Sequence, residues 1–171
     1  KMLFQRNTSG NKLTSVAEAD VFSSRGRWLL VCLILLLVVL VRARLLEVPL
    51  ERDEGEYAYM GQLLLQGVPP YAEAYNMKFP GTYLMYALMM SVFGQTVQGI
   101  HLGFLVLNCA TILLLYFLCR KIANDLSAII ASGSYALLSL SSSVLGFAAH
   151  ATHFVILAAL GGSLLLLSAV E

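Results

Sequence analysis

A dense group of charged residues, 52–56 (Arg-Asp-Glu-Gly-Glu), directly follows the first long apolar stretch of the chain. Two adjacent carboxylates at a helix start, close to a membrane surface, can act as a general base toward a hydroxyl acceptor or bind a divalent cation. Acidic pairs are also common in solvated turns that only cap a helix. Asp53 and Glu54 are therefore the first catalytic candidates, with helix capping as the alternative.

A second group that could do chemistry is the histidine pair His150 and His153. At a spacing of i, i+3 the two rings could share one helical face and bind a metal ion or titrate. Two histidines make an incomplete metal site, so the alternative is a pair of polar residues at the end of a membrane span. His101 has the same two interpretations. No motif in the sequence requires a cofactor. Binding of a divalent metal ion is an alternative that the sequence leaves open.

The composition places these residues in a membrane protein. Of the 171 residues, 58% are hydrophobic and only 12% are charged, and the mean hydropathy is +0.77. Soluble proteins average about 25% charged residues, so the solvated surface of a soluble domain is missing. A net charge of +1 gives no basic face for nucleic acid. The three cysteines lie in apolar runs without disulfide or metal-site spacing.

The apolar stretches predict the architecture. A spanning helix needs about 20 residues, and such stretches cover about 28–46, 99–119, 126–145 and 152–170. The stretch 81–94 would extend only about 21 Å at about 1.5 Å per residue, short of a core of about 30 Å. We expect it to be a re-entrant or interfacial helix. The sequence therefore predicts an all-α integral membrane protein with about four transmembrane helices, or five if residues 81–94 cross.

The charged residues mark one external loop, residues 48–98. All four prolines lie in or beside its first half, within residues 47–80. Residues 53–66 lack proline and carry apolar residues at helical spacing, which predicts an amphipathic helix on the membrane surface. Arg42 and Arg44, at the far end of the first apolar stretch, are expected to snorkel to the interface or to pair with nearby acids.

Basic residues predict the orientation. Residues 1–27 form a polar tail that contains five lysines and arginines, and Arg120-Lys121 end the second span. The positive-inside rule places both on the cytoplasmic side. With four spans, Asp53 and the histidine pair then face the opposite, non-cytoplasmic side.

Several short sequences in the loop follow a known order: residues 49–60 (PLERDEGEYAYM), 67–71 (GVPPY), 78–84 (KFPGTYL) and 93–94 (FG). Together they resemble the first external loop of GT-C glycosyltransferases. They are most similar to the branch with bacterial lipid A aminoarabinose and galacturonosyl transferases and protein O-mannosyltransferases. The resemblance covers about residues 28–170, and it implies that residues 28–171 are the N-terminal portion of a GT-C transmembrane module.

The resemblance implies a multi-pass enzyme of the bacterial inner membrane. It implies transfer of a sugar from a polyprenyl-phosphate donor to a hydroxyl acceptor at the outer membrane face. Asp53 matches the base that takes the acceptor's proton, Glu54 its supporting neighbour, and Lys78 the residue that holds the donor phosphate. Tyr57 and Tyr83 match aromatic positions near that pocket, with core packing as the alternative.

The chain also departs from the family. Glu56 stands where some relatives have a basic residue, and His150 and His153 stand in the loop where many relatives have a carboxylate. The family module has more spans than this chain, so the site is expected to be incomplete. The alternative function is therefore a non-catalytic GT-C-derived transmembrane subunit that packs in a larger membrane complex.

Overall fold

The computed structural model describes residues 23–170, and this part of the chain is helical without strands. The elements are α2 (Ser24–Ala43), α3 (Arg52–Leu65), α4 (Pro80–Phe93), α5 (Val97–Ile122), α6 (Asp125–Leu138), the short 3-10 helix η1 (Ser142–Val144) and α7 (Ala151–Val170). The predicted all-α class is thereby confirmed for the described residues. Most of the predicted tail, residues 1–22, lies outside them.

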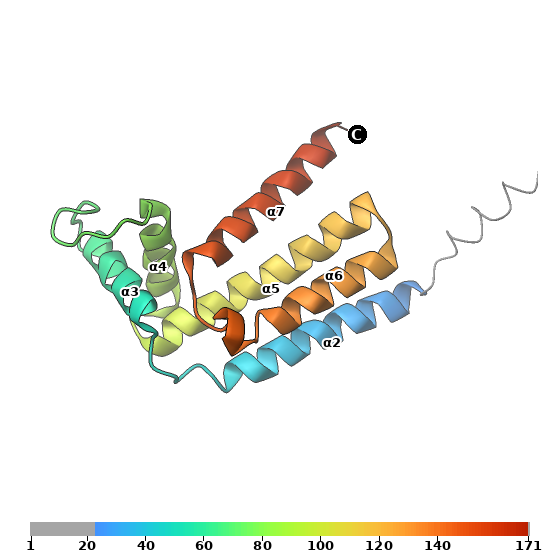
Figure 1. Cartoon of the computed structure of the whole chain (residues 1–171), viewed down its shortest axis with the longest axis horizontal. Helices are drawn as coiled ribbons and strands as arrows, with labels where there is room; N and C mark the ends of the chain where they lie inside the picture. Colours follow the sequence, from blue (N-terminus) through green and yellow to red (C-terminus); the bar gives the residue numbers. More distant parts are fainter. Residues whose placement is uncertain (1–22, 171) are drawn as a thin grey trace, which may run out of the picture.

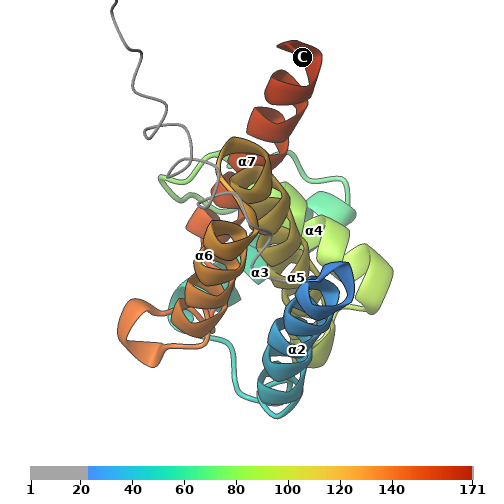
Figure 2. The same ribbon diagram turned by 90° about the vertical axis from the view of Figure 1, so that its right-hand side faces the viewer.

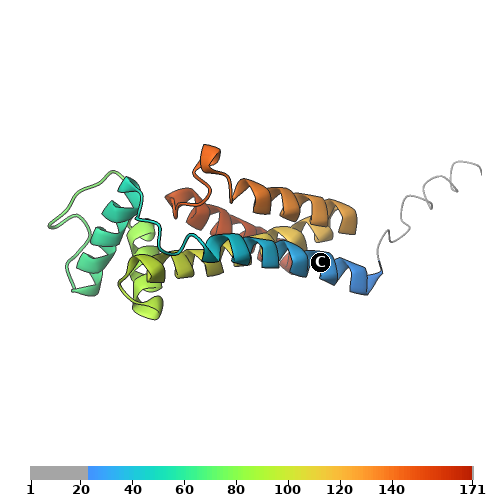
Figure 3. The same cartoon turned by 90° about the horizontal axis from the view of Figure 1, so that it is seen from below.

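Four of the helices form a bundle. Helices α2, α5, α6 and α7 run along the long axis and alternate in direction (Figures 1 and 3). Helix α5 packs against α2, α6 and α7, and the end-on view in Figure 2 shows these helices gathered around it. Because the directions alternate, segments 44–96 and 139–150 meet at one end of the bundle. The α5–α6 turn at Ala123 lies at the other end (Figure 1).

Helices α3 and α4 pack against each other at the end of the bundle where those segments meet (Figure 1). They confirm the predicted amphipathic helix over 53–66 and the short helix over 81–94. Their contact is close because Gly61 has no side chain: a Cβ there would lie 2.8 Å from Cε of Met90. Buried residues of α3 therefore lie against α4.

Three helices, α2, α5 and α7, are long and apolar enough to cross a membrane. The predicted third span, 126–145, differs: α6 has 14 residues and ends at Leu138. At about 1.5 Å per residue it extends about 21 Å. The expectation of about four spans is therefore supported for three helices, and a crossing by α6 stays a prediction.

Helix α6 ends early because the backbone after it makes tertiary contacts instead of helical hydrogen bonds. The guanidinium of Arg42 donates to the carbonyl oxygens of Ser139 and Gly146, at 2.8 Å each, and of Phe147 at 3.3 Å. A Cβ at Gly146 would lie 2.5 Å from the carbonyl oxygen of Leu138, so only glycine fits there. The apolar character of the sequence continues past Leu138, but the helix does not.

The other helix ends follow their capping residues. Helix α2 begins before the predicted Trp28 because the Ser23 hydroxyl accepts a hydrogen bond from the Gly26 N–H at 3.2 Å. Helix α3 begins with a capping box, in which Glu51 accepts from the Asp53 N–H at 2.8 Å and Glu54 from the Glu51 N–H at 3.0 Å. These caps fix where the charged residues of the loop lie.

Candidate functional site

The structure brings Asp53 next to His150, although the two are far apart in the sequence. Asp53 lies in the first turn of α3, and His150 immediately precedes α7. One oxygen each of Glu51 and Asp53 and one ring nitrogen of His150 lie within 4.8 Å of one another. All three residues are half-buried. The capping box of α3 and the start of α7 therefore form one polar cluster.

Glu54 lies beneath this cluster and is buried, with 1% of its surface exposed. Its carboxylate accepts hydrogen bonds from the backbone N–H groups of Ala149 at 2.6 Å and Glu51 at 3.0 Å. Nε2 of His101 lies 3.8 Å away. Burial by itself would raise the pKa of Glu54, but the His101 ring and the two backbone N–H donors outweigh it and lower the pKa below 4.5. Glu54 is therefore an anion, held in place from three directions.

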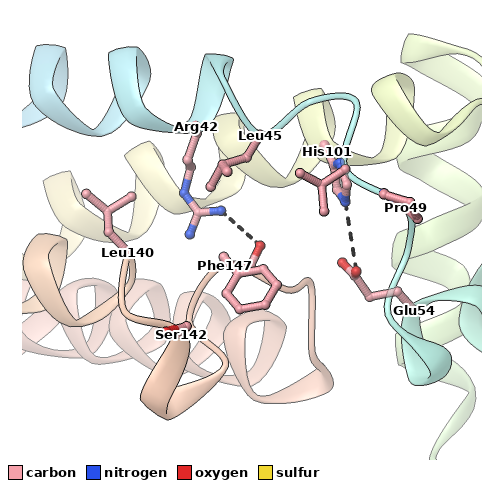
Figure 4. Close-up of a pocket in the computed structure, with 9 residues that line it drawn as sticks. Arg42, Leu45, Pro49, Glu54, His101, Leu140, Ser142 and Phe147 are labelled. Carbon is pink, nitrogen blue, oxygen red and sulfur yellow. Dashed lines mark hydrogen bonds and ion pairs between the residues drawn. The ribbon is translucent and has the colours of Figure 1, made fainter.

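Arg42 holds the same segment from the other side. It is also buried, and its guanidinium lies over the Phe104 ring, 4.4 Å from the ring centroid. Its three hydrogen bonds reach the carbonyls of residues 139, 146 and 147, whereas Glu54 binds the N–H of Ala149. Figure 4 shows Arg42 and Glu54 on opposite sides of a cavity of about 340 Å³. The segment that ends at His150 is thus fixed by one buried cation and one buried anion.

A second pocket, of about 250 Å³, contains most of the predicted site residues. Its lining includes Tyr57, Lys78, His150 and His153. Burial and the negative charges of neighbouring acids, Asp53 first among them, raise the pKa of Tyr57. Tyr57 therefore stays a neutral phenol near the Asp53 carboxylate. The structure thus groups Tyr57, Lys78 and His150 around one space. Asp53 does not line this pocket, but it lies next to His150.

Tyr83 is not among the residues that line this pocket. It is fully buried, and its hydroxyl donates to the carbonyl oxygen of Lys78 at 3.2 Å. Burial is the main cause that raises its pKa to about 12. Its ring packs against those of Tyr57 and Tyr71, with centroids 6.3 and 5.9 Å away. The core-packing alternative therefore describes Tyr83, which also supports the backbone of Lys78.

An apolar groove of about 630 Å³ adjoins the polar pocket. It lies between α4, with the loop that precedes it, and the first turns of α7, and its lining includes Met77, Phe79, Met85, Phe154 and Ala158. Lys78 lines both the groove and the polar pocket. One cation therefore stands where a polar space meets an apolar one.

Comparisons with protein-family models, curated proteins and solved structures gave no match to this chain.

His150 and His153 both line the polar pocket, but their rings have different neighbours. The ring of His153 packs on Phe104, with centroids 4.8 Å apart, and Nδ1 lies 3.4 Å from the Tyr135 hydroxyl. Only His150 joins the carboxylates of α3. His150 lies immediately before the first turn of α7, so the two histidines are not held by one regular helical turn, and their joint binding of a metal ion stays a prediction.

The sequence did not predict the contacts that three residues make at the α3 end of the bundle: Glu51, Arg42 and His101. Glu51 precedes Glu54 by three residues, which is the spacing of a capping box and could have identified it. Arg42 was expected to snorkel or to pair with acids, and it instead binds backbone carbonyls. His101 was treated as a minor candidate. Glu56, a departure from the family pattern, accepts a hydrogen bond from the Asn76 side chain and so holds the loop before Lys78.

Proposed function

We propose that this chain belongs to a GT-C-type glycosyltransferase, which moves a sugar from a polyprenyl-phosphate donor to a hydroxyl acceptor. The observation that carries the proposal is the place of Lys78, between the polar pocket and the apolar groove. A polyprenyl-phosphate sugar has the same division into a polar head and an apolar tail. Thioether and aromatic side chains such as Met85 and Phe154 suit an irregular lipid chain.

The charged side chains at the pocket suit both the leaving phosphate and the acceptor hydroxyl of the reaction. The bond from C1 of the sugar to the donor phosphate breaks, and a bond from C1 to the acceptor oxygen forms. The lipid phosphate leaves with the electron pair of the broken bond, and the Lys78 ammonium stabilises that developing charge. The half-buried Asp53 carboxylate takes the proton of the acceptor hydroxyl, beside the neutral phenol of Tyr57.

Glu54 acts in this proposal as a positioning residue. Its hydrogen bonds to Glu51 and Ala149 are internal, so both ends of the carboxylate are already engaged. It supports the reaction by holding the start of α3 against the segment before His150. This agrees with the supporting role that the family resemblance implies.

The proposal includes four spans, a cytoplasmic N-terminus and a site at the outer face of a bacterial inner membrane. Its support is the alternating direction of α2, α5, α6 and α7, which gathers Asp53, Lys78 and His150 at one end (Figure 1). Arg120 and Lys121 lie in the last turn of α5, at the other end. Basic residues at that end favour it as the cytoplasmic one.

A second candidate function, a non-catalytic subunit of a larger membrane complex, is favoured by helix α7. Phe154 is its one buried residue among Ala151–Val170. One face of α7 packs on α5, and the apolar residues of its other face are open to lipid or to another helix. Gly161 and Gly162 leave room for a close helix neighbour. This surface fits a subunit interface as well as it fits lipid.

A transfer assay separates the two functions. Protein purified in detergent is incubated with a radiolabelled polyprenyl-phosphate sugar and a bacterial lipid extract as the source of hydroxyl acceptors. The enzyme proposal expects labelled product that depends on both, and no product from a soluble sugar phosphate without the lipid. Absence of transfer from every polyprenyl-phosphate sugar supplied would contradict the enzyme and favour the subunit.

A further inference from the structure

We infer that Glu51, Asp53 and His150 form a binding site for one divalent metal ion. Their ligand atoms, two carboxylate oxygens and one imidazole nitrogen, lie within 4.8 Å of one another. The histidine comes from the α6–α7 segment and the carboxylates from the start of α3, so the cluster is made by the fold and not by one acidic run. The proposed transfer reaction does not use this combination of residues.

The ligand set has the charge and chemistry of a divalent site. Two carboxylates and a neutral imidazole balance an ion of charge 2+. Imidazole favours Zn²⁺ and similar transition metals, whereas Mg²⁺ prefers oxygen ligands alone. Three protein ligands leave a fourth position open, as in catalytic zinc sites. We therefore expect Zn²⁺, Co²⁺ or Mn²⁺ at this site in preference to Mg²⁺.

An independent observation concerns the His150 ring. Its Nε2 is buried, and no hydrogen-bond partner lies within reach in the part of the chain that the structure describes. An unpaired buried polar atom costs about 1–3 kcal/mol, and a metal bond is one way to recover that loss. The backbone of His150, in contrast to its ring Nε2, does have a partner. Its carbonyl oxygen accepts a hydrogen bond from the His153 N–H at 3.0 Å.

The cluster needs a small movement to close around an ion. Bonds of about 2.1 Å in a tetrahedral zinc site place the ligand atoms roughly 3.4 Å apart. The present separations of up to 4.8 Å are therefore bridged when side chains turn inward. The backbone is already fixed, because Glu54 binds the N–H of Ala149, next to His150, and that of Glu51. Arg52, which lies 3.6 Å from Asp53 with 90% of its side chain exposed, is free to turn toward solvent.

The role of the ion rests on the proposed function, but its binding does not. Beside the pocket that contains Lys78, the open coordination position would polarise the acceptor hydroxyl as a Lewis acid. One oxygen of Asp53 would bind the ion, and the other would take the acceptor's proton. Metal binding is measured without any sugar donor. A failure of the metal site and a failure of the transferase proposal are therefore distinguishable.

The test is equilibrium binding of metal to the purified protein in detergent after treatment with a chelator. Zn²⁺ is measured by dialysis and elemental analysis, and Co²⁺ by its visible absorption spectrum. We expect one ion per chain, and at least a tenfold loss of affinity in Glu51→Gln, Asp53→Asn and His150→Gln. The glutamine at 51 keeps a cap acceptor for the Asp53 N–H, so this variant is expected to fold. Matched controls are Glu73→Gln and His153→Gln.

Loss of binding only in the three ligand variants, with unfolding temperatures close to that of the wild type, supports the site. Sub-stoichiometric metal in the wild type overturns it. So does an affinity that the three substitutions leave unchanged, or one that His153→Gln lowers as much as His150→Gln. The Co²⁺ spectrum adds a readout that a purely structural role of these residues would not change.

Discussion

The carboxylate of Glu54 accepts a hydrogen bond from the backbone N–H of Ala149 at 2.6 Å, inside the protein. This bond joins the first turn of α3 to the segment before α7. It places His150 beside Glu51 and Asp53. The same carboxylate closes the capping box with Glu51, so one buried charge fixes both sides of the cluster.

Replacement of Glu54 should therefore destabilise the protein. Glu54→Gln keeps the shape but replaces one acceptor oxygen by a donor, which leaves a buried N–H without its partner. We expect a loss of about 1–3 kcal/mol in the free energy of unfolding. Glu47→Gln is the matched control, an exposed residue that should change stability by less than about 0.5 kcal/mol. Denaturant unfolding in detergent measures both, and equal effects would contradict the buried role.

Arg42 should matter more than the neighbouring Arg44. Arg42→Met keeps much of the apolar stem but leaves the carbonyls of residues 139, 146 and 147 without their donor. We expect a loss of about 3 kcal/mol or more, as for other buried charged partners. Arg44→Met changes an exposed residue and should cost less than about 0.5 kcal/mol. Similar unfolding curves for the two variants would show that Arg42 does not hold the α6–α7 segment.

Much of this fold can be predicted from local sequence signals. The amphipathic pattern of 53–66 and the apolar runs 81–94, 99–119 and 152–170 each correspond to a helix of the structure. The end of α6 could not be predicted in this way, because the apolar run continues past Leu138. What ends the helix is a contact with Arg42, far away in the sequence.

The candidate site was predictable only in part. The resemblance to a family selected Asp53 and Lys78, which the structure places around adjoining parts of one site. The role of Glu51 was missed because its neighbour His150 comes from a distant segment. The spacing of His150 and His153 allows a shared face only if both lie within one helix, and His150 precedes α7. Tertiary contacts, not spacing, decide which charged groups meet.

Ionisation of the buried Tyr83 hydroxyl should lower the free energy of unfolding at alkaline pH. Its pKa is raised from 10.0 to about 12, so the folded state holds the phenolic proton more tightly than the unfolded state. This contribution is complete below pH 10 and is lost as the pH rises through about 12. Tyr83→Phe should therefore show a shallower loss of stability in that range, and the exposed Tyr59→Phe should behave like the wild type. Thermal unfolding from pH 8 to 11.5 tests this, and parallel curves for all three proteins would contradict it.

Cysteine labelling tests the proposed topology. In a background without the three native cysteines, a cysteine at Ala123 should resist a membrane-impermeant thiol reagent in intact cells. A cysteine at Ala72, in the loop at the opposite end of the bundle, should react. Both positions are exposed, so a difference reports the side of the membrane. Labelling of both, or of Ala123 alone, would contradict an outer-face site.

Turnover of Asp53→Asn in the transfer assay is the direct test of whether Asp53 takes the proton of a sugar acceptor. We expect turnover to fall at least 100-fold, with an unfolding temperature close to that of the wild type. Glu73→Gln, a change of an exposed carboxylate in the same loop, should transfer sugar at the wild-type rate. Transfer by Asp53→Asn at the wild-type rate would contradict the account.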